Sequence, residues 1–132
     1  MTIGVIGGGA WGTALAQVMA QSADVLLWAR ETEVVAAINA THSNPDFLPG
    51  VALSPRVCAT TDLRALVDCT PWLVVAPAQH LRSVLAATDL RSRPPLVLCA
   101  KGIETGSLQL MAEVVADITD APVAVLSGPT FA

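Results

Sequence analysis

The chain has 132 residues, 53% apolar and 14% charged, which predicts one folded domain with a buried core and excludes a disordered polypeptide. Its 7 basic and 11 acidic residues give a net charge of −4, so the basic face that nucleic acid binding requires is not expected. The apolar runs are all shorter than the roughly 18 residues of a membrane span, which argues against a membrane protein.

Short apolar runs alternate with segments of helical spacing along the whole chain. The runs are continuous, as in parallel strands covered on both faces, and they occupy 2–7, 25–29, 56–60, 72–76, 96–100 and 123–126. Helices are predicted at 10–21, 32–40, 62–67, 81–87 and 107–117. This rhythm predicts an α/β fold, a doubly wound and mostly parallel sheet of order 3-2-1-4-5-6 with helices on both faces.

Two of the segment ends carry specific expectations. Thr61 or Asp62 is expected to cap the helix at 62–67, and Ser107 the last helix, with Leu108 beginning its apolar stripe. The segment 42–52 is expected to be a long loop, because it holds the turn formers Asn-Pro and Pro-Gly.

A glycine-rich turn follows the first predicted strand. Gly7, Gly9 and Gly12 match G-x-G-x-x-G between a strand and a helix, the context that dinucleotide binding requires. Gly7 would make the tight turn, Gly9 would let the backbone approach a pyrophosphate, and Gly12 would let the helix pack closely. The backbone N–H groups from Ala10 onward would then face the anion. The alternative is a turn with a structural role alone.

The tryptophans and the end of the second strand extend this hypothesis. Trp11, inside the turn, either belongs to the core or lines the cofactor, whereas Trp28 and Trp72 are interpreted as core residues. Arg30 follows the second strand, where a guanidinium suits the 2′-phosphate of NADP and favours it over NAD. Glu31 could instead hold the ribose diol of NAD, and an exposed Arg-Glu pair is the alternative.

Lys101 ends the strand at 96–100 on its carboxyl side, where open α/β sheets bind ligands. Its ammonium group suits a phosphate or a carbonyl oxygen, and a surface lysine is the alternative. The three cysteines, Cys58, Cys69 and Cys99, form no CxxC pair. No metal site or disulfide is therefore expected, and a reducing, cytoplasmic compartment fits best.

Five segments together give a resemblance to a known family. They are the GxGxWGTALA start, NPDFLPG at 44–50, APAQ at 76–79, KGIE at 101–104 and SGPTFA at 127–132. With these, the whole chain resembles the dinucleotide-binding domain of bacterial NAD(P)-dependent glycerol-3-phosphate dehydrogenase. The abrupt end at SGPTFA suggests a truncated Rossmann domain, residues 1–132, from a parent that also has a helical substrate domain.

The resemblance implies an activity and a set of contacts. The family reduces dihydroxyacetone phosphate reversibly to sn-glycerol 3-phosphate with NADH or NADPH, for glycerophospholipid synthesis, and the parent is implied to be a homodimer. The glycine turn and the resemblance together assign cofactor contacts to Gly7, Gly9, Ala10, Trp11, Gly12, Arg30, Lys101 and Ala132. The resemblance assigns substrate contacts to Lys101, Gly128 and Thr130.

No catalytic residue is assigned within the chain. The resemblance places the family's proton-transfer lysine beyond residue 132, and neither His42 nor His80 is expected to be catalytic. Thr130 keeps the hydroxyl of the serine that many relatives carry, whereas Ala78 lacks it at a second such position. The alternatives are a non-catalytic dinucleotide-binding module and a related ketone or hydroxyacid reductase, such as a ketopantoate reductase.

Overall fold

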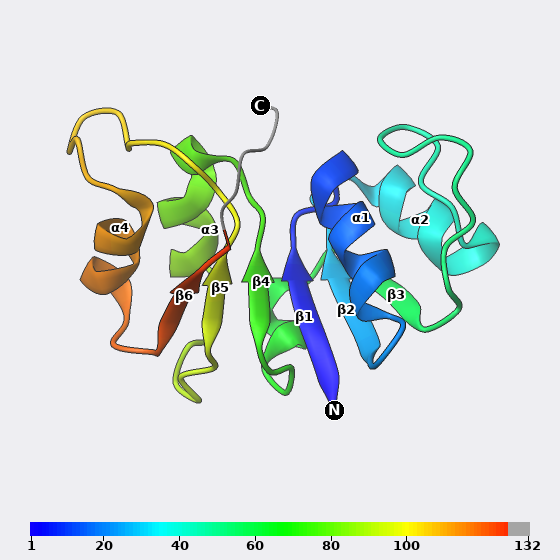
Figure 1. Cartoon of the computed structure of the whole chain (residues 1–132), viewed down its shortest axis with the longest axis horizontal. Coiled ribbons are helices and arrows are strands. Elements are labelled where there is room, and N and C mark those ends of the chain that lie inside the picture. Colours follow the sequence, from blue (N-terminus) through cyan, green and yellow to red (C-terminus); the bar gives the residue numbers. More distant parts are fainter. Residues whose placement is uncertain (127–132) are drawn as a thin grey trace.

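The computed structural model describes residues 1–126, in which six strands form one parallel sheet of order β3-β2-β1-β4-β5-β6 (Figure 1). The predicted strand order is confirmed. The strands are β1 (Thr2–Ile6), β2 (Asp24–Trp28), β3 (Val57–Thr60), β4 (Trp72–Val74), β5 (Leu96–Leu98) and β6 (Val123–Val125). The strand β3 ends at Thr60 as predicted, and the other five end one or two residues earlier than predicted.

Helices cover both faces of the sheet, as the sequence predicts. They are α1 (Ala10–Met19), α2 (Thr32–Thr41), α3 (Leu81–Ala86) and α4 (Met111–Ile118), with short 3-10 turns η1 (Leu63–Leu66) and η2 (Ala78–His80). The segment predicted at 62–67 is thus a 3-10 turn, and the Asp62 side chain caps it by accepting from the Arg64 N–H.

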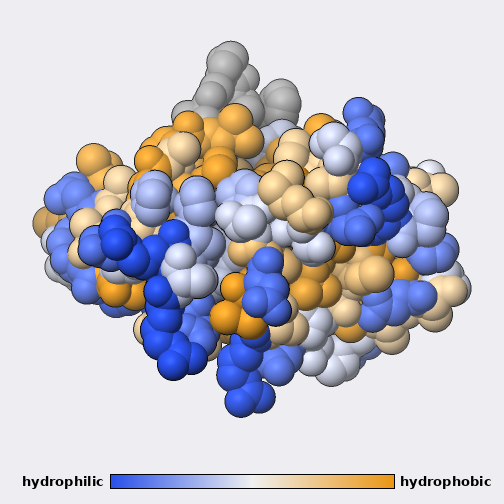
Figure 2. Space-filling view, turned by 90° about the horizontal axis from the view of Figure 1, so that it is seen from below, coloured by the Kyte–Doolittle hydropathy of each residue, from blue (hydrophilic) through white to orange (hydrophobic). Residues whose placement is uncertain are grey.

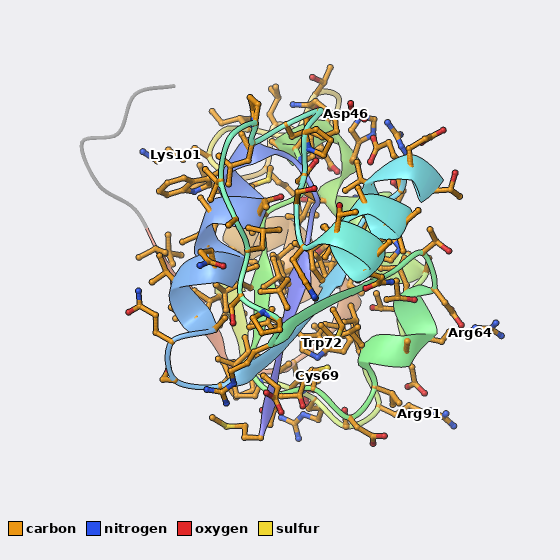
Figure 3. The ribbon with its side chains drawn as sticks, turned by 90° about the vertical axis from the view of Figure 1, so that its right-hand side faces the viewer. Asp46, Arg64, Cys69, Trp72, Arg91 and Lys101 are labelled. Carbon is orange, nitrogen blue, oxygen red and sulfur yellow. The ribbon has the colours of Figure 1, made fainter. Side chains whose placement is uncertain are left out.

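The core consists of two apolar clusters, one on each face of the sheet. The helices α1 and α2 pack on one face through Leu15, Val34 and Ile38, which contact the side chains of β1, β2 and β3. The turn η1 and the helices α3 and α4 cover the other face, where Trp72 is completely buried. The Trp72 Nε1–H donates to the carbonyl oxygens of Leu66 at 3.1 Å and Cys69 at 2.9 Å (Figure 3). The core interpretation of Trp72 is therefore confirmed.

The surface at the amino ends of the strands carries hydrophilic side chains among apolar ones (Figure 2). Asp24 and Arg56 pair there, with Arg56 Nε 2.9 Å from the Asp24 carboxylate, and they join the start of β2 to the start of β3. Such exposed pairs contribute little to stability.

The last helix begins four residues later than predicted. Leu108 has a left-handed backbone (φ 59°) and a side chain that is 77% exposed, so it is not part of an apolar stripe. The Ser107 hydroxyl binds the Glu104 carboxylate instead of capping a helix. The Glu113 carboxylate accepts from the Leu110 N–H at 3.2 Å, which fixes the start of α4 at Met111.

Side chains of α3 and of the turn before it anchor the segment between β5 and α4, which contains Lys101. The Gln79 amide donates to the Ile103 carbonyl at 2.9 Å and accepts from the Thr105 N–H at 2.8 Å. Arg82 donates to Glu104 at 3.0 Å, and also to Gln109 at 2.8 Å and Asp117 at 3.1 Å. The segment is therefore fixed by charge-assisted hydrogen bonds, which are the stronger kind.

We predict that the Arg82–Glu104 pair makes stability depend on pH. Hydrogen bonds from Arg82 and then Ser107 lower the pKa of Glu104 below its ordinary value of 4.5. Because the folded-state pKa is the lower one, this stabilisation is complete above pH 4.5 and is lost as the pH falls through the folded-state value. The variant Glu104→Gln should be less stable than wild type in urea unfolding at pH 7, and the difference should shrink as the pH falls. A difference that stays constant from pH 7 to the acid limit of folding would contradict the prediction.

Candidate functional site

The turn between β1 and α1 brings backbone against backbone. Gly7 has φ 129°, and a Cβ there would lie 3.1 Å from the Val75 carbonyl. A Cβ on Gly12 would lie 1.9 Å from the Gly7 carbonyl oxygen, a distance that no side chain can occupy. The expected tight turn and close helix packing are thus present.

Gly9 differs from its neighbours because a Cβ there would meet nothing within 4 Å. The Gly9 backbone has φ −73°, and it borders open space at the N-terminus of α1. This is the opening that a pyrophosphate would need, and the first N–H groups of a helix favour an anion.

A glycine is also required at position 8, which the motif in the sequence does not predict. A Cβ on Gly8 would lie 2.5 Å from the Ala29 Cβ, so the turn and the end of β2 both need small residues. The G-x-G-x-x-G pattern treats this position as variable, and only the packing of the turn on β2 reveals the requirement.

The turn opens into a cavity of about 580 Å³ at the carboxyl ends of the strands. Six residues predicted to contact the cofactor line it: Gly7, Gly9, Ala10, Trp11, Gly12 and Arg30. The volume is in the usual range for small-molecule sites, and the location is where open α/β sheets bind ligands. Trp11 is 49% exposed, so of the two interpretations of this residue the structure excludes the core.

Several further residues line the cavity, and among them only Glu31 is considered as a cofactor contact from the sequence. They are Gly8, Trp28, Glu31, Phe47, Leu63, Val75, Ala76, Pro77, His80, Ser83, Val84 and Ala87. Trp28 is half-buried rather than a full core residue, and its Nε1–H donates to the Thr61 carbonyl at 3.0 Å. Most of these residues come from three separate segments, which only the tertiary fold brings together.

Arg30 and Glu31 follow β2 and face the cavity side by side. The Arg30 side chain is 76% exposed, and its Nη2 lies 4.0 Å from the Glu31 carboxylate. This contact is long for an ion pair, so it restrains the guanidinium only weakly. Both residues line the cavity, and within residues 1–126 neither side chain forms a closer ion pair.

Lys101 lies three residues beyond the end of β5, at the carboxyl side of the sheet (Figure 3). It is exposed and does not line the cavity. The structure therefore places Lys101 on the predicted edge of the sheet but outside the cavity that holds the other candidates. Gly128, Thr130 and Ala132 lie outside the described residues.

Other site types find no support among residues 1–126. No group of three or more His, Cys, Asp or Glu side chains could hold a metal ion in this part of the chain. None of its helices has the length and apolar character needed to cross a bilayer. The cysteines are unpaired, and burial raises the pKa of the Cys69 and Cys99 thiols, which lowers their reactivity.

Comparison with known proteins identifies relatives of the chain. A glycerol-3-phosphate dehydrogenase [NAD(P)+] from Caulobacter vibrioides is 58% identical over 98% of this chain and 40% of its own length. The crystal structure of a glycerol-3-phosphate dehydrogenase from Coxiella burnetii is 34% identical, with a TM-score of 0.86 over 98% of this chain and 41% of that one. A ketopantoate reductase from Ralstonia eutropha shares the fold, with 20% identity and a TM-score of 0.73 over 95% of this chain and 40% of that one.

The chain spans 38% to 49% of the length of its most similar curated relatives. The family model described as NAD-dependent glycerol-3-phosphate dehydrogenase N-terminus matches residues 2–132, which is nearly the whole sequence. Together with the parallel sheet and the glycine turn, this match shows that the chain belongs to the N-terminal family of the NAD(P)-dependent glycerol-3-phosphate dehydrogenases.

Proposed function

We propose that residues 1–132 form an NAD(P)-binding Rossmann domain, and that the protein uses it to reduce dihydroxyacetone phosphate reversibly to sn-glycerol 3-phosphate. The observation that carries the proposal is the open backbone at Gly9, which faces a cavity of about 580 Å³ at the carboxyl ends of the strands. Family membership supports the choice of reaction. The homodimer implied by the resemblance stays a prediction.

The residues of the turn fit a dinucleotide. Gly9 leaves room for the diphosphate, and the N–H groups at the start of α1 supply donors to it. Arg30 is placed to bind a 2′-phosphate and Glu31 a ribose diol, which fits a family whose members accept NAD or NADP.

The rest of the chain's contribution is positioning and exclusion of water. A bound nicotinamide cofactor supplies the hydride for the carbonyl carbon. Apolar side chains such as Trp11, Phe47 and Val84 line the cavity and displace water from it. Lys101, at the edge of the sheet, is proposed to bind an anionic oxygen of the substrate, and Gly128 and Thr130 are proposed to complete that contact.

Gly9→Val is predicted to abolish cofactor binding without unfolding the domain. The valine side chain would extend into open space and fill the volume that a diphosphate needs. Calorimetric titration with NADH and NADPH measures the loss, and thermal unfolding checks the fold. Gly12→Val is the contrasting variant, since its side chain would collide with the Gly7 carbonyl and destabilise the fold itself. Cofactor binding by folded Gly9→Val would show that the turn has a structural role alone.

Arg30→Ala is predicted to weaken the binding of NADPH more than the binding of NADH. A charge-assisted hydrogen bond contributes about 1.5–3 kcal/mol, so the ratio of the two dissociation constants should change by roughly one to two decades. The control is Arg56→Ala, which removes an exposed arginine at the opposite end of the sheet and should leave the ratio unchanged. An equal loss for NADPH and NADH in Arg30→Ala would exclude a contact with the 2′-phosphate.

The reaction itself is tested with two proteins. One is the 132-residue chain, and the other is a chimera in which it replaces the matching part of the Caulobacter vibrioides relative. The chimera is expected to oxidise NADPH or NADH with dihydroxyacetone phosphate. The 132-residue chain is expected to bind cofactor without turnover, because general acid catalysis contributes about 10²- to 10⁴-fold and the family lysine is expected beyond residue 132.

A chimera that folds and binds cofactor but turns over no dihydroxyacetone phosphate would support the alternative of a non-catalytic dinucleotide-binding module. Turnover by the 132-residue chain alone would show that the chain carries its own proton donor.

A further inference from the structure

Asn44 is a buried polar residue that the proposed function does not use. It lies in the loop that follows α2, and its side chain reaches the glycine turn, 36 positions earlier in the chain. Its Nδ2 group donates to the Gly8 carbonyl at 3.0 Å and to the Thr13 hydroxyl at 2.8 Å. Asn44 and Thr13 are both fully buried.

The Asn44 side chain buries one polar atom whose loss of hydration is not compensated by a hydrogen bond within residues 1–126. Its Oδ1 is buried and has no hydrogen-bond partner in the described part of the chain. A buried polar atom without a partner is unfavourable, and the two hydrogen bonds that Nδ2 donates to Gly8 and Thr13 offset that cost. The two N–H donors are therefore the part of this side chain that the fold uses.

These donors fix the orientation of one peptide group. The Gly8 carbonyl points to Asn44, and the Thr13 hydroxyl lies 3.4 Å from the same oxygen. The Gly8–Gly9 peptide is trans, so its N–H points away from its carbonyl. The Gly9 N–H is thereby directed away from Asn44, on the glycine whose Cβ position is open.

The loop holds Asn44 in place by its own backbone. Pro45 follows Asn44 and restricts it to extended conformations. The Leu48 N–H donates to the Asn44 carbonyl at 2.8 Å, and the Leu48 side chain packs against the core. Asp46 of this loop lies at the same end of the sheet as Lys101 (Figure 3). The NPDFLPG segment thus closes on itself beside the glycine turn.

We propose that Asn44 is a positioning residue for the diphosphate of the dinucleotide. It acts through the Gly8 carbonyl, which sets the direction of the Gly9 N–H, and it does not touch the cofactor. This inference rests on the proposed dinucleotide site.

The test compares Asn44→Ala with Asn39→Ala. Asn39 is a matched control because its side chain also bonds backbone groups, with Nδ2 2.9 Å from the Ala59 carbonyl and Oδ1 2.8 Å from the Ala59 N–H. It joins α2 to β3 and does not line the cavity. Both variants should lose thermal stability, so binding is measured at a temperature where both are fully folded.

The probes are ADP, which has a diphosphate, and adenosine, which has none. Asn44→Ala should raise the dissociation constant for ADP at least tenfold and leave that for adenosine within twofold, whereas Asn39→Ala should leave both within twofold. If Asn44 had a structural role alone, its replacement would weaken the binding of both probes or of neither. ADP binding within twofold of wild type, or an equal loss with both probes, overturns the proposal.

If Asn44→Ala does not fold, Thr13→Val replaces it, because this nearly isosteric change removes the hydroxyl that accepts a hydrogen bond from Asn44. A dissociation constant that rises at least threefold for ADP and not for adenosine supports the proposal, and unchanged binding overturns it.

The wild-type chain separates this inference from the proposed function. If it binds neither NADPH nor ADP, the proposed function fails together with this inference. Wild-type binding that survives in the Asn44 variant overturns the inference alone.

Discussion

The approach of α1 to the end of β1 is the contact on which the site depends. A helix that starts this close to a strand leaves no volume for a Cβ at Gly12, and the turn needs the positive φ of Gly7. The same closeness requires small residues where the turn meets β2, at Gly8 and Ala29. Steric exclusion at these positions leaves Gly9 as the position where added volume would meet no protein atom, so the fold creates the opening before any ligand is present.

The parallel sheet then brings the remaining candidates to one edge. Because neighbouring strands run in the same direction, the residues that follow β1, β2, β4 and β5 all leave the sheet on the same side. Arg30 and Lys101 therefore share an edge with the glycine turn, although they are separated by 71 positions in sequence (101 − 30). The net charge of −4 does not oppose an anionic ligand there, since the helix N-terminus and the arginine act locally.

The features that the sequence predicted well are those set by local sterics and periodicity. Continuous apolar runs identified the six strands, the glycine spacing identified the turn, and the strand rhythm together with this turn predicted the strand order. The predicted start of the last helix, at Ser107, is wrong because Ser107 and Leu108 fit the pattern of a cap and an apolar stripe. That pattern is overridden by Arg82 on α3, whose bond to Glu104 fixes a loop there. Likewise, Ser83 and Val84 reach the cavity through tertiary packing, and they belong to none of the motifs found in the sequence.

The helix α3 joins the two halves of the proposed site. Ser83 and Val84 line the cavity, while the adjacent Arg82 binds Glu104 in the segment that contains Lys101. The side-chain amide of Gln79, just before the helix, bonds two backbone groups of the same segment, the Ile103 carbonyl and the Thr105 N–H. One helix therefore supplies both a wall of the cavity, through Ser83 and Val84, and a bond to the segment that contains Lys101, through Arg82.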